Sequence, residues 1–351
     1  MPSRDARPGA RSVATARKNR PAAATTPDRA PRPPADGLVV GFVPPMAHVA
    51  GMLLALAGVL GIAAGVPTYL VVGGRHLHQV GGVGTLLVAL ALPVLHLAVG
   101  IPLARAAVPR LGLAYAAVAA ALSVGQVLIE VYRAVPSTSR PPVEVIAGER
   151  VLTSSVSVGA GWILGVLSLC AVLAAGLCAL LAWERTVMED GGPLDPARSA
   201  LAGGALMLGV VTVLSLALPA ADVPDSIVTD PTTGMQTVVS GEGPQALLER
   251  PGLALLGGLL LAGALLLCSV IAPSLRPRLA TVGGLLAISG SVLSAGLIGV
   301  RDALVSPALE WTVPGAALLV CGLAYAGLTV LAWRWRRSFP EPTSRARSLR
   351  R

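Results

Sequence analysis

The chain has 351 residues, of which 54% are hydrophobic and only 13% are charged, and its mean hydropathy is +0.73. A soluble globular protein is about 25% charged, so these figures exclude a water-soluble enzyme with one compact core, and the apolar content excludes a disordered chain. The net charge of +9 is concentrated in tails and short turns, which favours a membrane-topology signal over a nucleic-acid partner.

Residues 1–45 are predicted to form a disordered, basic cytoplasmic tail. The segment is rich in Arg, Pro, Ala and Thr and cannot bury a core. It lacks the short apolar stretch and small-residue cleavage site of a signal peptide, so we expect it to be retained. Residues 335–351 form a second basic cytoplasmic tail. The intervening residues 46–334 are predicted to be the transmembrane domain.

The predicted fold class is all-α, a polytopic membrane protein with a bundle of about eight transmembrane helices. Each span has about twenty apolar residues, enough to cross a hydrocarbon layer of ~30 Å, and must be helical because lipid offers peptide groups no hydrogen-bond partner. The predicted spans are 49–72, 81–104, 111–132, 158–182, 199–219, 252–273, 279–299 and 313–333.

The basic residues predict the orientation of the bundle. With both tails cytoplasmic, the inner segments hold 21 of the 27 Lys and Arg residues, as the positive-inside rule requires. All five tryptophans then fall near a predicted membrane interface, which is the level that Trp prefers. We therefore expect a multi-pass protein of a bacterial cell membrane with both termini in the cytoplasm.

The two longer outer loops, 133–157 and 220–251, carry alternating β-branched residues. In the first loop, strands at 143–146 and 150–153 would flank a turn at Gly148; in the second, strands at 226–229 and 235–239 would flank Asp-Pro-Thr-Thr-Gly. An isolated hairpin is only marginally stable, so we expect the two hairpins to pair into one small outer sheet.

The short inner turns resemble one another, which suggests that the spans are four copies of a helical hairpin. The turn that begins at Ala106 and contains Pro-Arg-Leu resembles the one that begins at Leu275, and the segment after Pro196 resembles the second. The alternative is that any short turn in an Arg-rich chain has this composition.

A polar stripe on the third span contains the candidate site residues. Ser123, Gln126, Glu130 and Arg133 fall within an arc of about 80° on a helix. Ionisable residues within a span are costly and often functional, which favours an outward vestibule or a proton or ion relay. The structural alternative is interhelical hydrogen bonding with a boundary ion pair between Glu130 and Arg133.

His96 is a weaker candidate, since it is the only histidine deep in a span. We expect a neutral imidazole bonded to a neighbouring helix, because a haem would need a second histidine at the same depth. His76 and His78 have a metal-like spacing, but two histidines are weak evidence for a metal site. The four cysteines lie in apolar runs and favour packing. We predict no catalytic residue, metal site or cofactor.

The sequence favours a non-enzymatic, structural or partner-binding membrane component, because it carries no recognisable catalytic motif. The alternative is a small-solute transporter or permease that uses the stripe on the third span. The expected partners are the bilayer, anionic lipid headgroups at the basic tails, and a protein partner or second copy of the chain.

Overall fold

The computed structural model describes residues 38–136, 138, 143–146, 149–190, 194–223, 226–229, 236–239, 252–305 and 309–335. The predictions for the tails 1–45 and 335–351 therefore fall almost wholly outside the described residues. Within the described part of the chain, eight helices are long and apolar enough to cross a membrane, which confirms the predicted helical membrane fold. They are α1 (Pro45–Ala64), α2 (Val83–Ala104), α3 (Pro109–Arg133), α4 (Ala160–Trp183), α5 (Asp195–Leu216), α6 (Gly252–Ser274), α7 (Arg278–Val305) and α8 (Val313–Arg334).

The largest difference from the predicted spans concerns α1, which was expected over 49–72. The helix begins at Pro45 and ends at Ala64, before Gly65 and Pro67. Proline at the first helical position has no amide hydrogen to leave unsatisfied and has a helix-compatible φ, so it starts a helix well. The apolar residues beyond the helix belong to strand β2 (Leu70–Val72), because apolarity alone does not distinguish a strand from a helix.

The loop between α1 and α2, at the end of the bundle predicted to be outer, forms part of a sheet that the sequence did not predict. Strand β2 pairs on one side with β3 (Arg75–Leu77) and on the other with β6 (Val156–Val158), both antiparallel. Gly73 and Gly74 make the two-residue turn between β2 and β3, with φ of 57° and 78°. Such angles at both turn positions suit a hairpin and favour glycine.

The two predicted hairpins are present, but the prediction that they form one sheet is wrong. Strands β4 (Val143–Ile146) and β5 (Glu149–Leu152) form one two-stranded sheet, and β9 (Ser226–Thr229) and β10 (Gln236–Val239) form another. The first hairpin instead contributes Ile146 and Val151 to a small apolar core with Tyr69, Leu70, Val72 and Leu77. Burial against this core stabilises it without a second hairpin.

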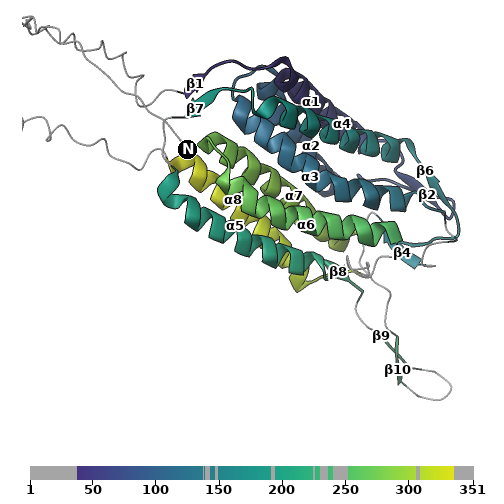
Figure 1. Cartoon of the computed structure of the whole chain (residues 1–351). Coiled ribbons are helices and arrows are strands. Elements are labelled where there is room, and N and C mark those ends of the chain that lie inside the picture. The colour runs from purple at the N-terminus through teal and green to yellow at the C-terminus, as the bar shows by residue number, and fades with distance from the viewer. Residues whose placement is uncertain are drawn as a thin grey trace, which may run out of the picture. The chain divides into compact units, whose positions relative to one another are not determined.

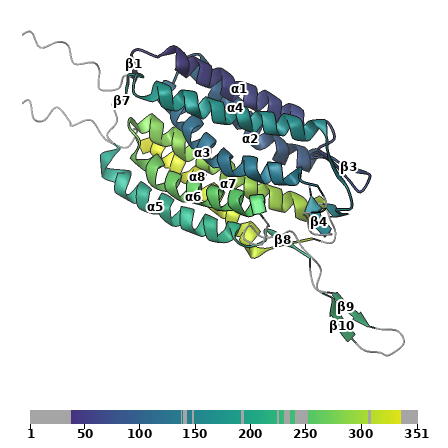
Figure 2. The same cartoon turned by 45° about the vertical axis from the view of Figure 1, so that its right-hand side comes forward.

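The helices form two four-helix groups with the same topology, as Figures 1 and 2 show. In the first group α1 packs against α2 and α4, and α3 packs against α4; in the second α5 packs against α6 and α8, and α7 packs against α8. In each group the strand after the first helix pairs with the strand before the fourth: β2 with β6, and β8 (Ala221–Asp222) with β11 (Glu310–Trp311). The topology therefore repeats every four helices, a longer unit than the helical hairpin that the inner turns suggested.

The sequences of the two groups match at the end of the bundle where the third helix of each group begins and the fourth helix ends. Pro109-Arg110-Leu111 begins α3 and Pro277-Arg278-Leu279 lies at the start of α7. Leu-Ala-Trp ends α4 at Trp183 and recurs at the end of α8 at Trp333. These paired positions give a residue-by-residue correspondence between α3 and α7.

The two matched arginines make the same contact. Arg110 Nη2 donates to the Thr186 carbonyl just after α4 (2.6 Å), and Arg278 Nη1 donates to the Trp333 carbonyl at the end of α8 (2.6 Å). The Arg110 guanidinium also lies over the Trp183 ring, 4.5 Å from its centroid. A cation near the carbonyl end of a helix is favourable, so each arginine fastens the third helix of its group to the fourth.

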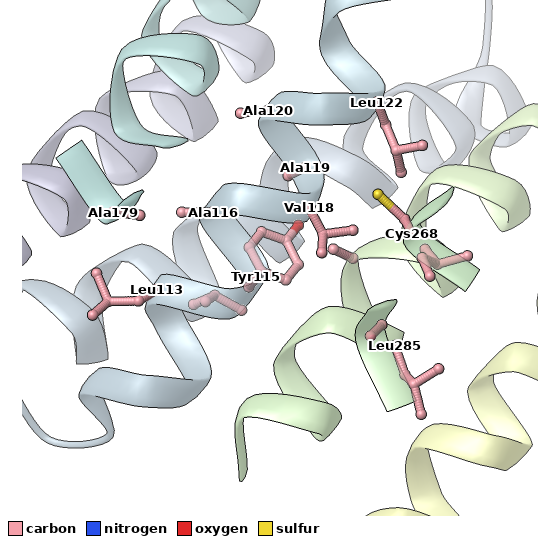
Figure 3. Close-up of a cluster of buried hydrophobic side chains, with 14 of the residues drawn as sticks. Leu113, Tyr115, Ala116, Val118, Ala119, Ala120, Leu122, Ala179, Cys268 and Leu285 are labelled. Carbon is pink, nitrogen blue, oxygen red and sulfur yellow. The ribbon is translucent and has the colours of Figure 1, made fainter. Parts of the chain in front are cut away.

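The central helices of the bundle are α3 and α7. In the most apolar 18-residue stretch of each of these two helices, 61% and 56% of the residues are buried, against 39% or less in the other helices. The groups meet where α3 packs against α7 and α6, and α7 packs against α2. Figure 3 shows Ala116 of α3 on the side of Ala179 of α4, while Leu122 is on the side of Cys268 of α6. Across this interface α3 packs against α6 as α7 packs against α2, so the two groups are arranged like the subunits of a twofold-symmetric dimer.

One short sheet joins the described start of the chain to the loop between α4 and α5. Strand β1 (Leu38–Val40) pairs antiparallel with β7 (Met188–Asp190), which follows α4. The Gly41 amide adds a further hydrogen bond to the Val187 carbonyl (2.9 Å). The chain is therefore attached to the loop between α4 and α5 before it enters α1.

Candidate functional site

The four residues of the predicted stripe lie on α3, but the structure places them in three different surroundings. Ser123 is buried, and its hydroxyl donates to the Ala119 carbonyl one turn earlier (2.8 Å). This bond is internal to the helix, as is usual for a serine in an apolar span. The Ser123 hydroxyl is therefore hydrogen-bonded within α3 itself.

Gln126 lines a small cavity of about 40 Å³ between α3 and the second group of helices. The polar residues of its lining are Gln126, Thr212 and Ser291, and the rest of the lining is apolar: Leu122, Leu216, Leu261, Leu265, Val292, Ala295 and Leu318. Glu130 is absent from this lining. Gln126 and Glu130 therefore do not share this cavity.

Glu130 and Arg133 lie at the outer end of α3 and share a third partner, Tyr69. Arg133 Nη1 donates to Glu130 Oε1 (2.7 Å) and to the Tyr69 hydroxyl (3.0 Å), and that hydroxyl donates to Glu130 Oε2 (2.5 Å). The side chains of Glu130 and Arg133 are 20% and 39% exposed. Hydrogen bonds to charged partners are the stronger ones, so this triad fixes the first outer loop to α3.

Two further groups complete the surroundings of the triad. Trp162, in the first turn of α4, donates its indole N–H to the Glu130 carbonyl (2.9 Å). On α7, Asp302 acts electrostatically on Arg133 while it is ion-paired with Arg301 (2.7 Å). Counted from the Pro-Arg-Leu motifs, Arg301 is the α7 counterpart of Arg133. Two ion pairs, Glu130–Arg133 and Arg301–Asp302, therefore lie near the ends of the central helices α3 and α7.

Tyr69 sits in a place that favours its neutral form. The residue is 3% exposed and belongs to the small apolar core that includes Leu70, Val72 and Leu77 of strands β2 and β3. Burial raises the pKa of the Tyr69 phenol well above its usual value, and the Glu130 carboxylate raises it further while Arg133 opposes the shift. Tyr69 is therefore a neutral residue between a carboxylate, to which it donates, and a guanidinium, from which it accepts. Such an arrangement suits a structural contact.

His96, the weaker candidate, is buried on α2 and meets a ring. Its imidazole lies edge-on to Tyr115 of α3, with ring centroids 5.9 Å apart. Among the described residues it makes no side-chain hydrogen bond, so the expected bond to a neighbouring helix is replaced by an aromatic contact. The Tyr115 hydroxyl is likewise buried without a hydrogen-bond partner in the described part of the chain.

The histidines of the first outer loop lie on and beside β3. His78 Nε2 is 3.4 Å from the Thr68 hydroxyl oxygen. Among the residues that the structure describes, no three His, Cys, Asp or Glu side chains are grouped closely enough to hold a metal ion.

Tyr69 and Trp162 were not identified as site residues from the sequence. Tyr69 falls within the predicted first span and Trp162 near a predicted interface, yet both direct their polar atoms to Glu130. The signal that could have located Tyr69 is the run Tyr-Leu-Val-Val-Gly-Gly, which is typical of a hairpin strand and marks the loop as folded.

Comparison with known proteins finds no matching family model, no similar curated protein and no similar solved structure. Function therefore has to be argued from the site itself.

Proposed function

We propose that this chain is a non-enzymatic, structural or partner-binding component of the cell membrane, with both termini in the cytoplasm. The observation that carries the proposal is the triad: Glu130 and Arg133, the ionisable residues of the stripe, bond to each other and to Tyr69. A relay or substrate site needs such groups available to a ligand, whereas here they join an outer loop to a central helix.

Close helix packing supports the same proposal. Gly125 of α3 and Gly257 of α6 face each other so closely that a Cβ on Gly257 would lie 2.6 Å from the Gly125 carbonyl oxygen. Small residues that let helix backbones touch stabilise association in lipid. Large alternating movements would have to break such contacts.

The orientation and partners rest on the charge distribution. The basic turns and tails favour a cytoplasmic inner side, where the tails 1–45 and 335–351 would attract anionic lipid headgroups. A protein partner or a second copy of the chain remains the proposed ligand of a binding component.

A small-solute transporter is the second candidate, and the cavity at Gln126 favours it. The cavity lies between the two topologically equivalent groups, where many transporters bind their substrates. Its lining is mainly apolar and its volume is about 40 Å³, which is small compared with the 300 Å³ or more of typical ligand pockets.

Osmotic shrinkage of vesicles separates the two candidates. Three vesicle preparations are compared: with the purified chain, with the Glu130→Gln variant and without protein. Each is mixed with a hyperosmotic solution of glycerol, urea, an amino acid or potassium chloride, and the rate of re-swelling is measured by light scattering. A structural component leaves re-swelling at the protein-free rate for both proteins. Faster re-swelling of the wild-type vesicles than of the protein-free vesicles, with any of these solutes, would establish the transporter instead, and its loss in Glu130→Gln would assign the path to the stripe.

A further inference from the structure

The polar side chains that line the cavity at Gln126 can form more hydrogen bonds than they form within the protein. The Thr212 hydroxyl donates to the Leu208 carbonyl (2.6 Å), which leaves its oxygen able to accept. Within the described residues the side chains of Gln126 and Ser291 make no hydrogen bond. Gln126 and Ser291 are half-buried, and a polar group that faces an apolar lining without a hydrogen bond costs free energy. A small hydrogen-bonding occupant would therefore stabilise these side chains.

The residues that line the cavity differ from their counterparts on the other side of the interface between the groups. Leu122, which lines it, lies thirteen residues after Pro109, and its counterpart thirteen residues after Pro277 is Gly290. At Gly290 the space is filled, because Leu95 of α2 lies where a Cβ would be. At this pair of matched positions, Leu95 therefore fills the space beside α7, whereas Leu122 of α3 lines an opening.

The equivalent serines show the same contrast. Ser123 and Ser291 occupy matched positions on α3 and α7. Ser123 is bonded to its own helix, whereas Ser291 lines the cavity. The polar group on the open side therefore needs a partner that the other side does not.

We propose that this cavity is an internal hydration site, in which water bound by Gln126, Ser291 and Thr212 bridges the two groups of helices. A water needs about 10–15 Å³ of such space and two to four polar partners, so a cavity of about 40 Å³ holds two or three waters. An apolar cavity of this size would stay dry. The three polar side chains therefore determine that the cavity is wet.

Radiolytic hydroxyl-radical labelling of the full chain in detergent or nanodiscs tests this proposal. Radicals formed from a bound water oxidise the side chains beside it, even when these are inaccessible to bulk solvent. Leu122, Leu265 and Leu318 line the cavity and are as buried as Leu54 and Leu113, which do not. We expect several-fold more oxidation at the three cavity leucines than at the two controls; equal oxidation would overturn the proposal.

A double variant and a matched control sharpen the result. Gln126→Leu with Ser291→Ala removes two of the three polar groups and should reduce oxidation of the cavity leucines to the level of Leu54. Ser294→Ala, close by on the same helix but outside the lining, should leave oxidation unchanged. Persistent cavity labelling in the double variant would overturn the role of these side chains, and the wild-type comparison decides hydration even if the variant fails to fold.

Discussion

The Tyr69 hydroxyl donates a 2.5 Å hydrogen bond to the Glu130 carboxylate, across 61 positions of sequence. The bond joins the first outer loop to a central helix of the bundle. Because Arg133 donates to both residues, removal of any one of the three leaves a charged or polar group short of a partner.

The Glu130→Gln variant should be less stable than the wild type. The substitution leaves Arg133 without its carboxylate, and loss of a charged hydrogen-bond partner costs about 1–3 kcal/mol. Thermal unfolding in detergent measures the effect, with Glu184→Gln at an exposed position as the control. An unchanged midpoint for Glu130→Gln would contradict the triad's structural role.

Tyr69 should make the protein sensitive to alkali. The folded state raises the pKa of Tyr69, so above the unfolded-state value of about 10 the unfolded chain releases a proton that the folded chain retains. The contribution of Tyr69 is thus fully present below pH 10 and decreases as the pH rises further. In unfolding measured from pH 8 to about pH 11, Tyr69→Phe should show a shallower alkaline decline, and an identical slope would refute this account.

Gly125→Ala should strongly destabilise the bundle. A Cβ at this position would overlap the Gly257 carbonyl oxygen of α6, and backbone cannot move aside as a flexible side chain can. Gly263→Ala is the matched control, since a Cβ there meets nothing within 4 Å and alanine is the better helix former by about 1 kcal/mol. Thermal melting should therefore separate the two variants in opposite directions; equal midpoints would show that α3 and α6 are not in contact.

Two buried tyrosines should respond oppositely to the loss of their hydroxyls. The Tyr325 hydroxyl donates to the Ala205 carbonyl (2.9 Å) and lies 2.8 Å from the Ser269 hydroxyl oxygen, so Tyr325→Phe should cost about 1 kcal/mol or more. The Tyr115 hydroxyl is buried without a partner among the described residues, so Tyr115→Phe should be neutral or stabilising. A loss of stability in Tyr115→Phe matching that of Tyr325→Phe would indicate a hidden partner for Tyr115.

The sequence by itself determined that the chain forms membrane-spanning helices. Twenty-residue apolar runs permit few other structures in lipid, where each peptide group must be satisfied within its own helix. The boundaries of α6 and α8 were predicted to within a residue because glycine, proline and charged residues flank them. Local hairpin signals likewise located β4–β5 and β9–β10, since a turn and its strands are contiguous in sequence.

Only the tertiary structure decided what the polar residues do. The helical stripe placed Ser123, Gln126, Glu130 and Arg133 on one face, but a face has different neighbours at each depth. Glu130 meets Tyr69, which was predicted to lie within the first span, and Gln126 meets a cavity lined mainly by helices of the second group. The periodicity of one segment predicts which side chains share a face of its helix. Their burial and their hydrogen-bond partners depend on segments far away in sequence, which no local pattern specifies.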